Sequence, residues 1–255
     1  MLLSTAFCPP VEYFAVLAGY SPVFLEACES YAKQSWRNRC RILSANGPLD
    51  LTVPVVHPTG ASTSPPAGGT CPRAHGQVNQ DFADSQALGS GRLITGVSVE
   101  YTTPWVAKME KAIDSAYDSS PFFEFYRDGL YAILDSRPEK LWDLNLRIIK
   151  WICERIGIAP EIRLTEDFEK SEAFKNSPPS QGGVRGGNSS GLTVPPSSFD
   201  LREAIHPKRP NTILRDLGLE RPYWQVFGDK FGFVQGLSVL DLLFNEGPES
   251  ICWLR

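Results

Sequence analysis

Residues 31–42 read YAKQSWRNRCRI, a basic run in a chain that is mildly acidic overall. At the two-residue period of a β-strand, three arginines share one face: Arg37, Arg39 and Arg41. Guanidinium groups in a row suit planar anions such as phosphate or carboxylate, because they donate paired hydrogen bonds to such oxygens. The alternative is an edge strand whose solvated charges deter pairing with other chains. The pattern predicts a basic strand and a candidate anion site.

The segments around this run predict further strands and one helix. An Asn46-Gly47 turn leads to the apolar run at 51–55, which is a hairpin signal. Upstream, residues 2–6 and 22–26 predict strands. Between them, Pro9-Pro10 opens a helix that Gly19 ends, because proline is favoured in a first helical turn.

The middle of the chain, residues 93–170, predicts mainly helices. Residues 97–101 alternate as a strand does, and helices begin at Thr103-Pro104, at Pro121 and at Pro138. The third of these helices carries one apolar stripe and stops at Gly157. The stripe consists of Leu141, Leu144, Ile148, Ile152 and Ile156. A short strand is expected at 162–165.

The last block, residues 199–255, predicts a short helix at 200–205, a strand at 223–227 and a helix from Ser238 to Gly247. Strands mixed with helices throughout indicate an α/β fold, a mixed sheet with flanking helices. We expect one domain over 1–255. Two segments rich in Pro, Gly and Ser, 58–92 and 176–198, are expected to be disordered low-complexity insertions, because they cannot bury enough apolar surface.

Composition limits the classes of function. The net charge of −4 and the pI near 5.5 argue against a nucleic-acid partner, since such domains are usually basic. Three histidines and the lack of a C-x-x-C pair make a metal site or redox pair unexpected. No apolar run reaches the roughly 18 residues of a membrane span, and the N-terminus lacks a basic leader. We therefore expect a cytoplasmic protein.

Three residues are candidates for catalysis. Asp241 is an acid within an apolar run, although Ser238-x-x-Asp241 is also the pattern of a capping box. Glu246 lies at a helix C-terminus, where an acid opposes the helix dipole. His206 has a near-neutral pKa suited to a general base, and it lies beside Lys208 and Arg209. A lone histidine is more often structural.

Three segments together resemble the WbqC-like protein family, whose members most similar to this chain are bacterial. The segments contain these runs: Pro9-Pro10 with Tyr13-Phe14, Tyr31 to Arg39 and Leu51 to Pro54; Trp105, Ala116-Tyr117 and Ser120 to Phe123; and Tyr223 to Phe227, Gly232-Phe233 and Leu237 to Pro248. The family takes its name from a gene of surface-polysaccharide clusters, which implies a role in building or decorating glycans. Relatives carry His where this chain has Met109 and Phe231, and Pro-Asn where it has Gln235-Gly236, which weakens a His-based mechanism.

The resemblance favours a composite site. It supports the arginine segment and the segment from Asp241 to Glu246 as signature positions, and no settled reaction comes with it. Our first hypothesis is a cytoplasmic transferase that acts on an anionic small molecule such as a nucleotide sugar. Its substrate-binding residues would be Lys33, Arg37, Asn38, Arg39 and Asn245, beside the catalytic candidates. The alternative is a non-catalytic ligand-binding or scaffold protein of the same pathway. The enzyme hypothesis requires the first and last blocks, residues 1–57 and 199–255, to converge on one cleft. Placement of Arg37 and Asp241 on opposite sides of the protein would rule it out. No particular cofactor or oligomeric state is indicated.

Overall fold

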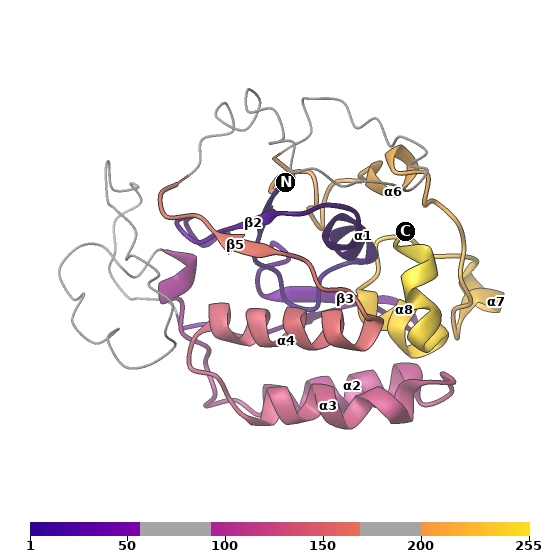
Figure 1. Ribbon diagram of the computed structural model, residues 1–255. Helices are drawn as coiled ribbons and strands as arrows, with labels where there is room; N and C mark the ends of the chain where they lie inside the picture. The colour runs from indigo at the N-terminus through magenta and orange to yellow at the C-terminus, as the bar shows by residue number, and fades with distance from the viewer. Residues whose placement is uncertain (57–92, 169–199) are drawn as a thin grey trace.

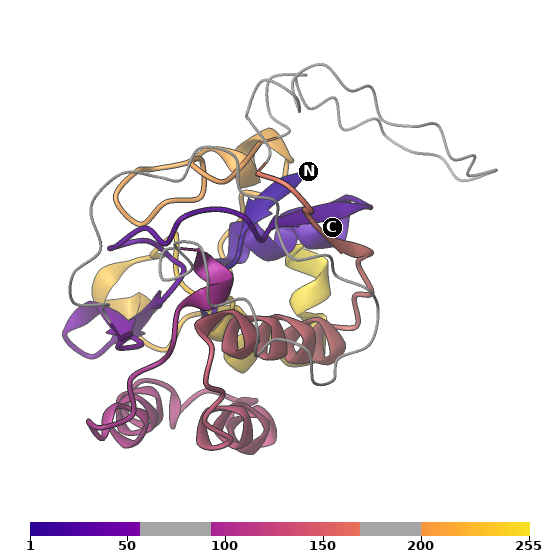
Figure 2. The same cartoon turned by 90° about the vertical axis from the view of Figure 1, so that its left-hand side faces the viewer.

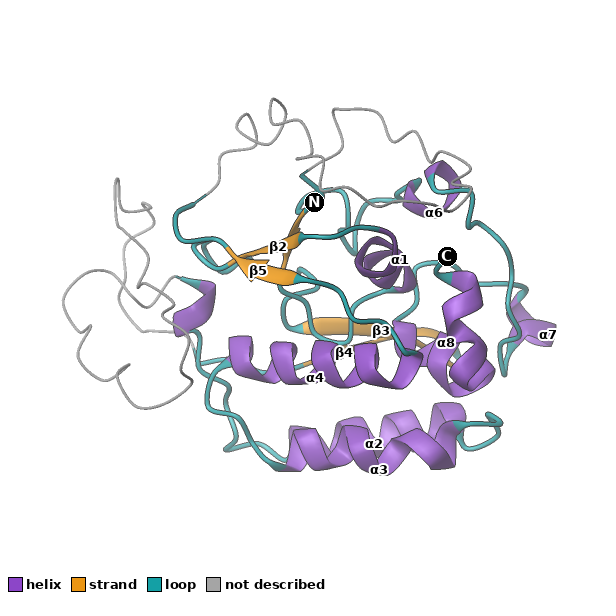
Figure 3. Ribbon diagram, in the orientation of Figure 1, coloured by secondary structure: helices purple, strands orange, loops and turns teal. Residues whose placement is uncertain are grey.

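The computed structural model describes residues 1–56, 93–168 and 200–255. Its elements combine a three-stranded parallel sheet, a two-stranded antiparallel sheet and flanking helices, which confirms the mixed α/β class. Figure 3 shows the helices and strands of this arrangement. The two predicted insertions, 58–92 and 176–198, lie outside the described residues.

The parallel sheet has the order β1-β2-β5, with β1 at Leu2–Ser4, β2 at Val23–Glu26 and β5 at Ile162–Leu164. Helix α1, Val11–Gly19, connects β1 to β2, since parallel neighbours need a crossover of this kind. Residue pairs such as Leu2 and Phe24 set the register. Most side chains of β1 and β2 are buried, as expected for a sheet covered on both faces.

The antiparallel hairpin consists of β3, Arg39–Ser44, and β4, Gly47–Thr52. The predicted Asn46-Gly47 turn is confirmed. Gly47 adopts φ +106°, a conformation that glycine reaches without steric cost. The predicted basic strand is partly wrong, because β3 begins at Arg39 and Arg37 lies in the turn before it. The second strand also begins earlier than the predicted 51–55.

Three helices cover one side of the sheets: α2, Trp105–Tyr117; α3, Phe123–Asp135; and α4, Leu141–Ile156. In Figures 1 and 2, α4 lies between the strands and the paired helices α2 and α3. The predicted stripe of α4 is buried along its whole length. Gly157 ends the helix in the left-handed conformation, with its N–H on the Cys153 carbonyl, as predicted.

The C-terminal part carries α6, Ile213–Asp216; α7, Gly228–Phe231; α8, Val239–Glu246; and the 3-10 helix η3, Gly247–Trp253. Helix α8 was predicted, whereas α6 and α7 were not. The predicted helix at 200–205 and strands at 97–101 and 223–227 are wrong: turns, isolated bridges and extended chain stand there instead. No helix among the described residues is long and apolar enough to cross a membrane.

Candidate functional site

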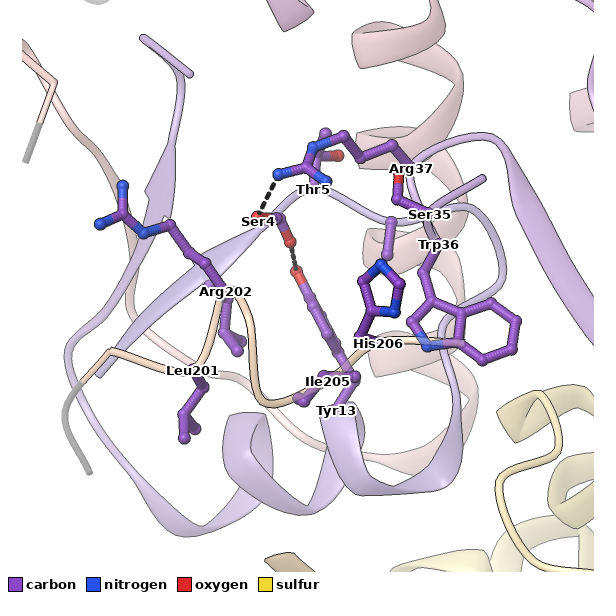
Figure 4. A pocket seen from close by; sticks show the side chains of 12 residues that line it. Ser4, Thr5, Tyr13, Ser35, Trp36, Arg37, Leu201, Arg202, Ile205 and His206 are labelled. Carbon is purple, nitrogen blue, oxygen red and sulfur yellow. Dashed lines mark hydrogen bonds between the residues drawn. The ribbon is translucent and has the colours of Figure 1, made fainter. Parts of the chain in front are cut away.

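A pocket lies at the carboxyl end of β1, where α/β proteins commonly bind ligands because the ends of parallel strands open toward the connecting loops. Three distant segments line it: Leu3 to Ala6, Ser35 to Arg37, and Leu201 to His206, together with Tyr13 from α1. Figure 4 shows these side chains around the pocket. Arg37 and His206 therefore share one pocket, although they are 169 positions apart in the chain.

Arg37 forms a buried ion pair with Glu29 in the wall of this pocket. Its Nε donates to Glu29 Oε1 at 2.8 Å, and its Nη2 donates to Ser4 Oγ at 2.9 Å. The Ser4 hydroxyl in turn donates to Glu29 Oε2 at 2.8 Å. Burial raises the pKa of Glu29, while Arg37 acts in the opposite direction. Since Glu29 neutralises Arg37, this arginine orients the pocket wall rather than offering an unpaired charge.

A second buried network lies at the same edge of the sheet. Arg202 Nη2 donates to Asp200 Oδ2 at 2.7 Å, and Arg202 Nη1 donates to Glu26 Oε2 at 3.0 Å. The Thr165 hydroxyl donates to Glu26 Oε1 at 2.6 Å. Hydrogen-bonded ion pairs therefore lie at the carboxyl edge of the parallel sheet. This edge is a strongly polar environment for a protein interior.

His206 is placed as a hydrogen-bond donor to the pocket. Its Nδ1 accepts from the backbone N–H of Lys208 at 3.2 Å, so the neutral ring carries its proton on Nε2. Partial burial lowers the pKa of His206, Glu203 opposes this, and the charges of Arg209, Lys208 and Arg37 lower it further. At neutral pH the ring is therefore uncharged, and its Nε2–H can donate to an anion.

Exposed cations lie on two segments that also contribute residues to the pocket. Lys208 Nζ donates to Gln34 Oε1, which joins the 206–209 segment to the loop that contains Lys33. Lys33 and Lys208 are both exposed, and neither forms a salt bridge with any described residue. Arg209 lies 3.4 Å from the exposed carboxylate of Glu203. We call Lys33, Lys208 and Arg209 the basic rim.

The pocket behind the basic rim is small. Its enclosed volume is about 20 Å³, which is room for about one water molecule. Thr5 borders it, is completely buried and leaves its Oγ1 without a hydrogen-bond partner among the described residues. A larger ligand would therefore lie mainly on the rim, with one polar group reaching inward.

The other predicted ligands of the basic run serve the hairpin. Asn38 Nδ2 donates to the Val53 carbonyl at 2.8 Å, and Arg39 and Arg41 both reach Asp50. The shortest of these arginine contacts, from Arg41 Nε, is 2.7 Å long. Asn145 Nδ2 donates to the Arg37 carbonyl at 2.8 Å and so ties this loop to α4.

Asp241 lies in a different buried cluster and does not line the pocket. Its Oδ2 accepts from the Tyr223 hydroxyl at 2.8 Å and from Gln225 Nε2 at 3.1 Å, while its Oδ1 has no partner among the described residues. Burial is the main cause that raises its pKa to about 6. The predicted capping box is formed only in part: Ser238 caps Leu240, but the Asp241 carboxylate faces the tyrosine instead.

The remaining candidates close the end of α8. Asn245 Oδ1 accepts from the Ser120 hydroxyl at 2.8 Å, and Glu246 Oε1 accepts from the Trp224 N–H at 3.1 Å. Of the two positions where the resemblance leads us to expect His in relatives, Met109 is buried and Phe231 is exposed. No cluster of three or more metal-binding side chains occurs within 1–56, 93–168 and 200–255.

Sequence patterns missed Ser4 and Glu29, the partners that hold Arg37. Ser4 lies within the strand predicted at 2–6, and Glu29 follows the strand predicted at 22–26 by three residues. Polar residues near the ends of parallel strands were the signal that could have identified them. Tyr223 and Gln225 were missed because the 223–227 run was interpreted as a strand, which gives no reason for their side chains to meet Asp241.

Comparison with known proteins supports the resemblance noted in the sequence. The model of the WbqC-like protein family matches residues 5–64 and 84–183, which is more than half of the chain. The chain belongs to the WbqC-like protein family. This WbqC-like protein is also 26% identical over 261 residues to the uncharacterized protein Rv1507c of Mycobacterium tuberculosis (strain ATCC 25618 / H37Rv), covering 100% of this chain and 96% of that protein. No solved structure matches it significantly.

Proposed function

We propose that this WbqC-like protein is a transferase-like enzyme of surface-polysaccharide biosynthesis that binds a phosphorylated or nucleotide-activated metabolite at the basic rim. The observation that carries the proposal is the hydrogen bond from Lys208 to Gln34, which brings the 206–209 segment to the loop that contains Lys33. Exposed ammonium groups without carboxylate partners attract an anion, and a phosphate offers each of them an oxygen.

The surrounding groups suit the same anion. His206 Nε2–H would donate to a phosphate oxygen, because its Nδ1 is already occupied by the Lys208 N–H. The Arg37–Glu29 pair would keep the pocket wall in place, and the unpartnered Thr5 hydroxyl would meet the group that enters the pocket. Ligand binding at a preformed wall costs less ordering entropy than binding to a mobile loop.

None of the three predicted catalytic residues is placed as a general base within this pocket. The engaged Nδ1 favours His206 as a donor, and Glu246 is bonded to a backbone N–H elsewhere. Asp241, whose pKa of about 6 suits proton transfer near neutrality, lies in the separate cluster with Tyr223. The small enclosed volume and the engaged imidazole favour the second candidate, a ligand-binding or scaffold protein of the same pathway without turnover.

Thermal unfolding with added ligands tests the proposed binding. The probes are pyrophosphate, UDP, UDP-glucose and coenzyme A, each compared for the wild type and for the double variant Lys33→Ala/Lys208→Ala. A ligand present at about 100 times its Kd stabilises the fold by about 2.7 kcal/mol, which is a shift of about 5–10 °C for a protein of this size. We expect the double variant to lose most of that shift.

The control variant is Lys111→Ala, which removes an exposed lysine of α2 outside the pocket. It should keep the ligand shift, and raised salt should weaken binding to the wild type. A shift of the same size in the double variant would rule out the basic rim. Release of UDP from UDP-glucose, followed by ³¹P NMR with candidate acceptors, separates the enzyme from the binding protein.

A further inference from the structure

A second pocket lies on another side of α1. Val11 borders it, whereas Tyr13 borders the first pocket. Residues two positions apart in an α-helix project about 200° apart around the helix axis, so the two pockets lie on different sides of α1. Its other walls come from α6, from the segments on either side of α7 and from η3, all in the right-hand part of Figure 1. We call Tyr223, Phe233 and Trp253, with Arg221 and Gln235 at their edge, the aromatic shelf.

Hydrogen bonds on its inner side hold the aromatic shelf in place. Gln225 clamps Val234 through both backbone groups, with its Nε2 on the carbonyl and its Oε1 on the N–H, each at 2.9 Å. The Tyr223 hydroxyl is fixed on Asp241, and Trp253 Nε1 donates to the Pro222 carbonyl at 3.4 Å. The shelf is therefore preorganised without a ligand.

The arrangement of the shelf requires that the carboxylate of Asp241 be buried, which costs folding free energy. Asp241 is 1% exposed, and neither its Oδ1 nor the nearby Tyr117 hydroxyl makes a hydrogen bond of normal geometry to a described residue. The Tyr117 hydroxyl is still close enough to lower the pKa of Asp241 against the larger effect of burial. A buried carboxylate with incomplete hydrogen bonding is destabilising, so a neutral residue would serve the core better. Local conflicts of this kind concentrate at functional sites. The structure here keeps the acid in contact with Tyr223, a wall of the second pocket.

The outer side of the shelf is exposed apolar surface with planar polar groups at its edge. Phe233, the most exposed ring of the shelf, is 39% exposed. The rings of Tyr223 and Phe233 stand at 83° with centroids 5.2 Å apart, so they form a corner. Arg221 lies over Trp253, and Gln235 donates to Glu220 while its amide oxygen is unused in any described hydrogen bond.

We propose that the aromatic shelf binds a pyranose ring. A sugar ring has an apolar C–H face that packs on an aromatic side chain and a rim of hydroxyls that bond to planar groups such as guanidinium and amide. A nucleobase also stacks on an aromatic face but has no ring of hydroxyls for the groups at the edge of the shelf, so uridine and adenosine are the competing ligands in the test. In the proposed transferase the bound sugar would be the acceptor; that role rests on the proposed function, whereas sugar binding does not.

Nuclear magnetic resonance of the full chain tests this inference. The probes are the methyl α-pyranosides of glucose, galactose and mannose, titrated while the indole N–H signals are followed. The Trp253 signal, assigned with Trp253→Phe, should shift with at least one of the three sugars. Phe233→Ala should weaken that sugar's affinity at least tenfold, and Arg221→Met should weaken it without removing a ring from the corner.

The matched control is Phe125→Ala, which removes a ring that is 79% exposed on α3, outside the shelf. It should bind the sugar as the wild type does. Absence of any Trp253 shift, equal affinity in Phe233→Ala, or a shift with uridine or adenosine but with none of the sugars would overturn the inference. Phe233→Ala should keep anion binding at the basic rim, so failure of the shelf and failure of the rim are distinguished.

Discussion

Arg37 donates two hydrogen bonds to Glu29, and both side chains are more than nine-tenths buried. Breaking a buried ion pair by removing one partner typically costs about 3–5 kcal/mol, because the other charge is left unpaired. An Arg37→Ala variant would therefore lose stability whether or not Arg37 contacts a ligand. Lys208 is the better residue for testing anion binding, since it is exposed and outside any described salt bridge.

Asp241 gives a pH-dependent prediction at the residue scale. Burial raises its pKa from 3.8 to about 6, so the folded protein binds the proton more tightly than the unfolded chain does. The free energy of unfolding then falls as the pH rises between these values and stays lower above them. Asp241→Asn should raise it by up to about 3 kcal/mol at pH 8 and leave it nearly unchanged at pH 4.

Urea unfolding at pH 4, 6 and 8 measures this effect. The asparagine can accept the bonds from Tyr223 and Gln225 through its amide oxygen, so the hydrogen-bonding geometry is retained. Asp118→Asn, an exposed acid at the end of α2, should show no gain that depends on pH. A wild type and Asp241→Asn variant of equal stability at pH 8 would contradict the raised pKa.

Gly247 ends α8 in a conformation and a space that favour glycine over any other residue. It adopts φ +56° and ψ −130°, and a Cβ there would lie 2.6 Å from the Phe122 ring. Gly247→Ala should reduce the free energy of unfolding by about 3 kcal/mol, because the backbone strain and the overlap each cost about 1–3 kcal/mol. Chemical denaturation measures the loss as a lower midpoint.

Gly19→Ala is the matched control for that change. Gly19 is the last residue of α1, its φ is not positive, and a Cβ there meets nothing within 4 Å. The substitution should be neutral or stabilising by up to about 1 kcal/mol, since alanine restricts the unfolded chain. If Gly247→Ala were as stable as Gly19→Ala, the close packing of Phe122 on the turn would be wrong.

Elements with local signals were predictable from the sequence. Helix α4 has an apolar stripe and a glycine stop, and the hairpin has an Asn-Gly turn, so their patterns involve only neighbouring residues. The 223–227 run failed because its aromatic residues suit a strand, yet the chain there has no strand partner. Its side chains pack on α8 instead, a contact that depends on the tertiary fold.

The candidate site was predictable only in part, for the same reason. The basic run and His206 carried visible charge, and the structure places Arg37 and His206 in one pocket. Asp241 could not be separated from that pocket in advance, because helix packing decides which side chains meet. Arg37 points inward because it bonds to Glu29, which lies on another loop. The spacing of residues along the chain does not show which loops will come into contact, so this pairing could not be predicted.

At the scale of the whole molecule, the C-terminal block completes the N-terminal one. The Ser238 N–H donates to the Arg41 carbonyl at 2.7 Å, the Val11 N–H to the Leu237 carbonyl at 3.2 Å, and the Leu201 N–H to the Leu2 carbonyl at 2.9 Å. Nearly every side chain of α8 is buried against the rest of the protein. Both pockets combine residues from the two blocks, so the sites depend on this packing.

This packing predicts that the two blocks fold as one cooperative domain. Fragments 1–168 and 200–255, prepared separately, should each lack a cooperative urea transition, because each exposes the apolar surface that the other covers. Mixed at equal concentration, they should regain near-ultraviolet circular dichroism and a single transition. Leu240→Asp in the shorter fragment should prevent reassembly, because it places a charge at a completely buried position. The control Asp229→Asn changes an exposed position of the same fragment and should leave reassembly intact. A cooperative transition of fragment 1–168 alone, unchanged by its partner, would instead indicate two independent domains.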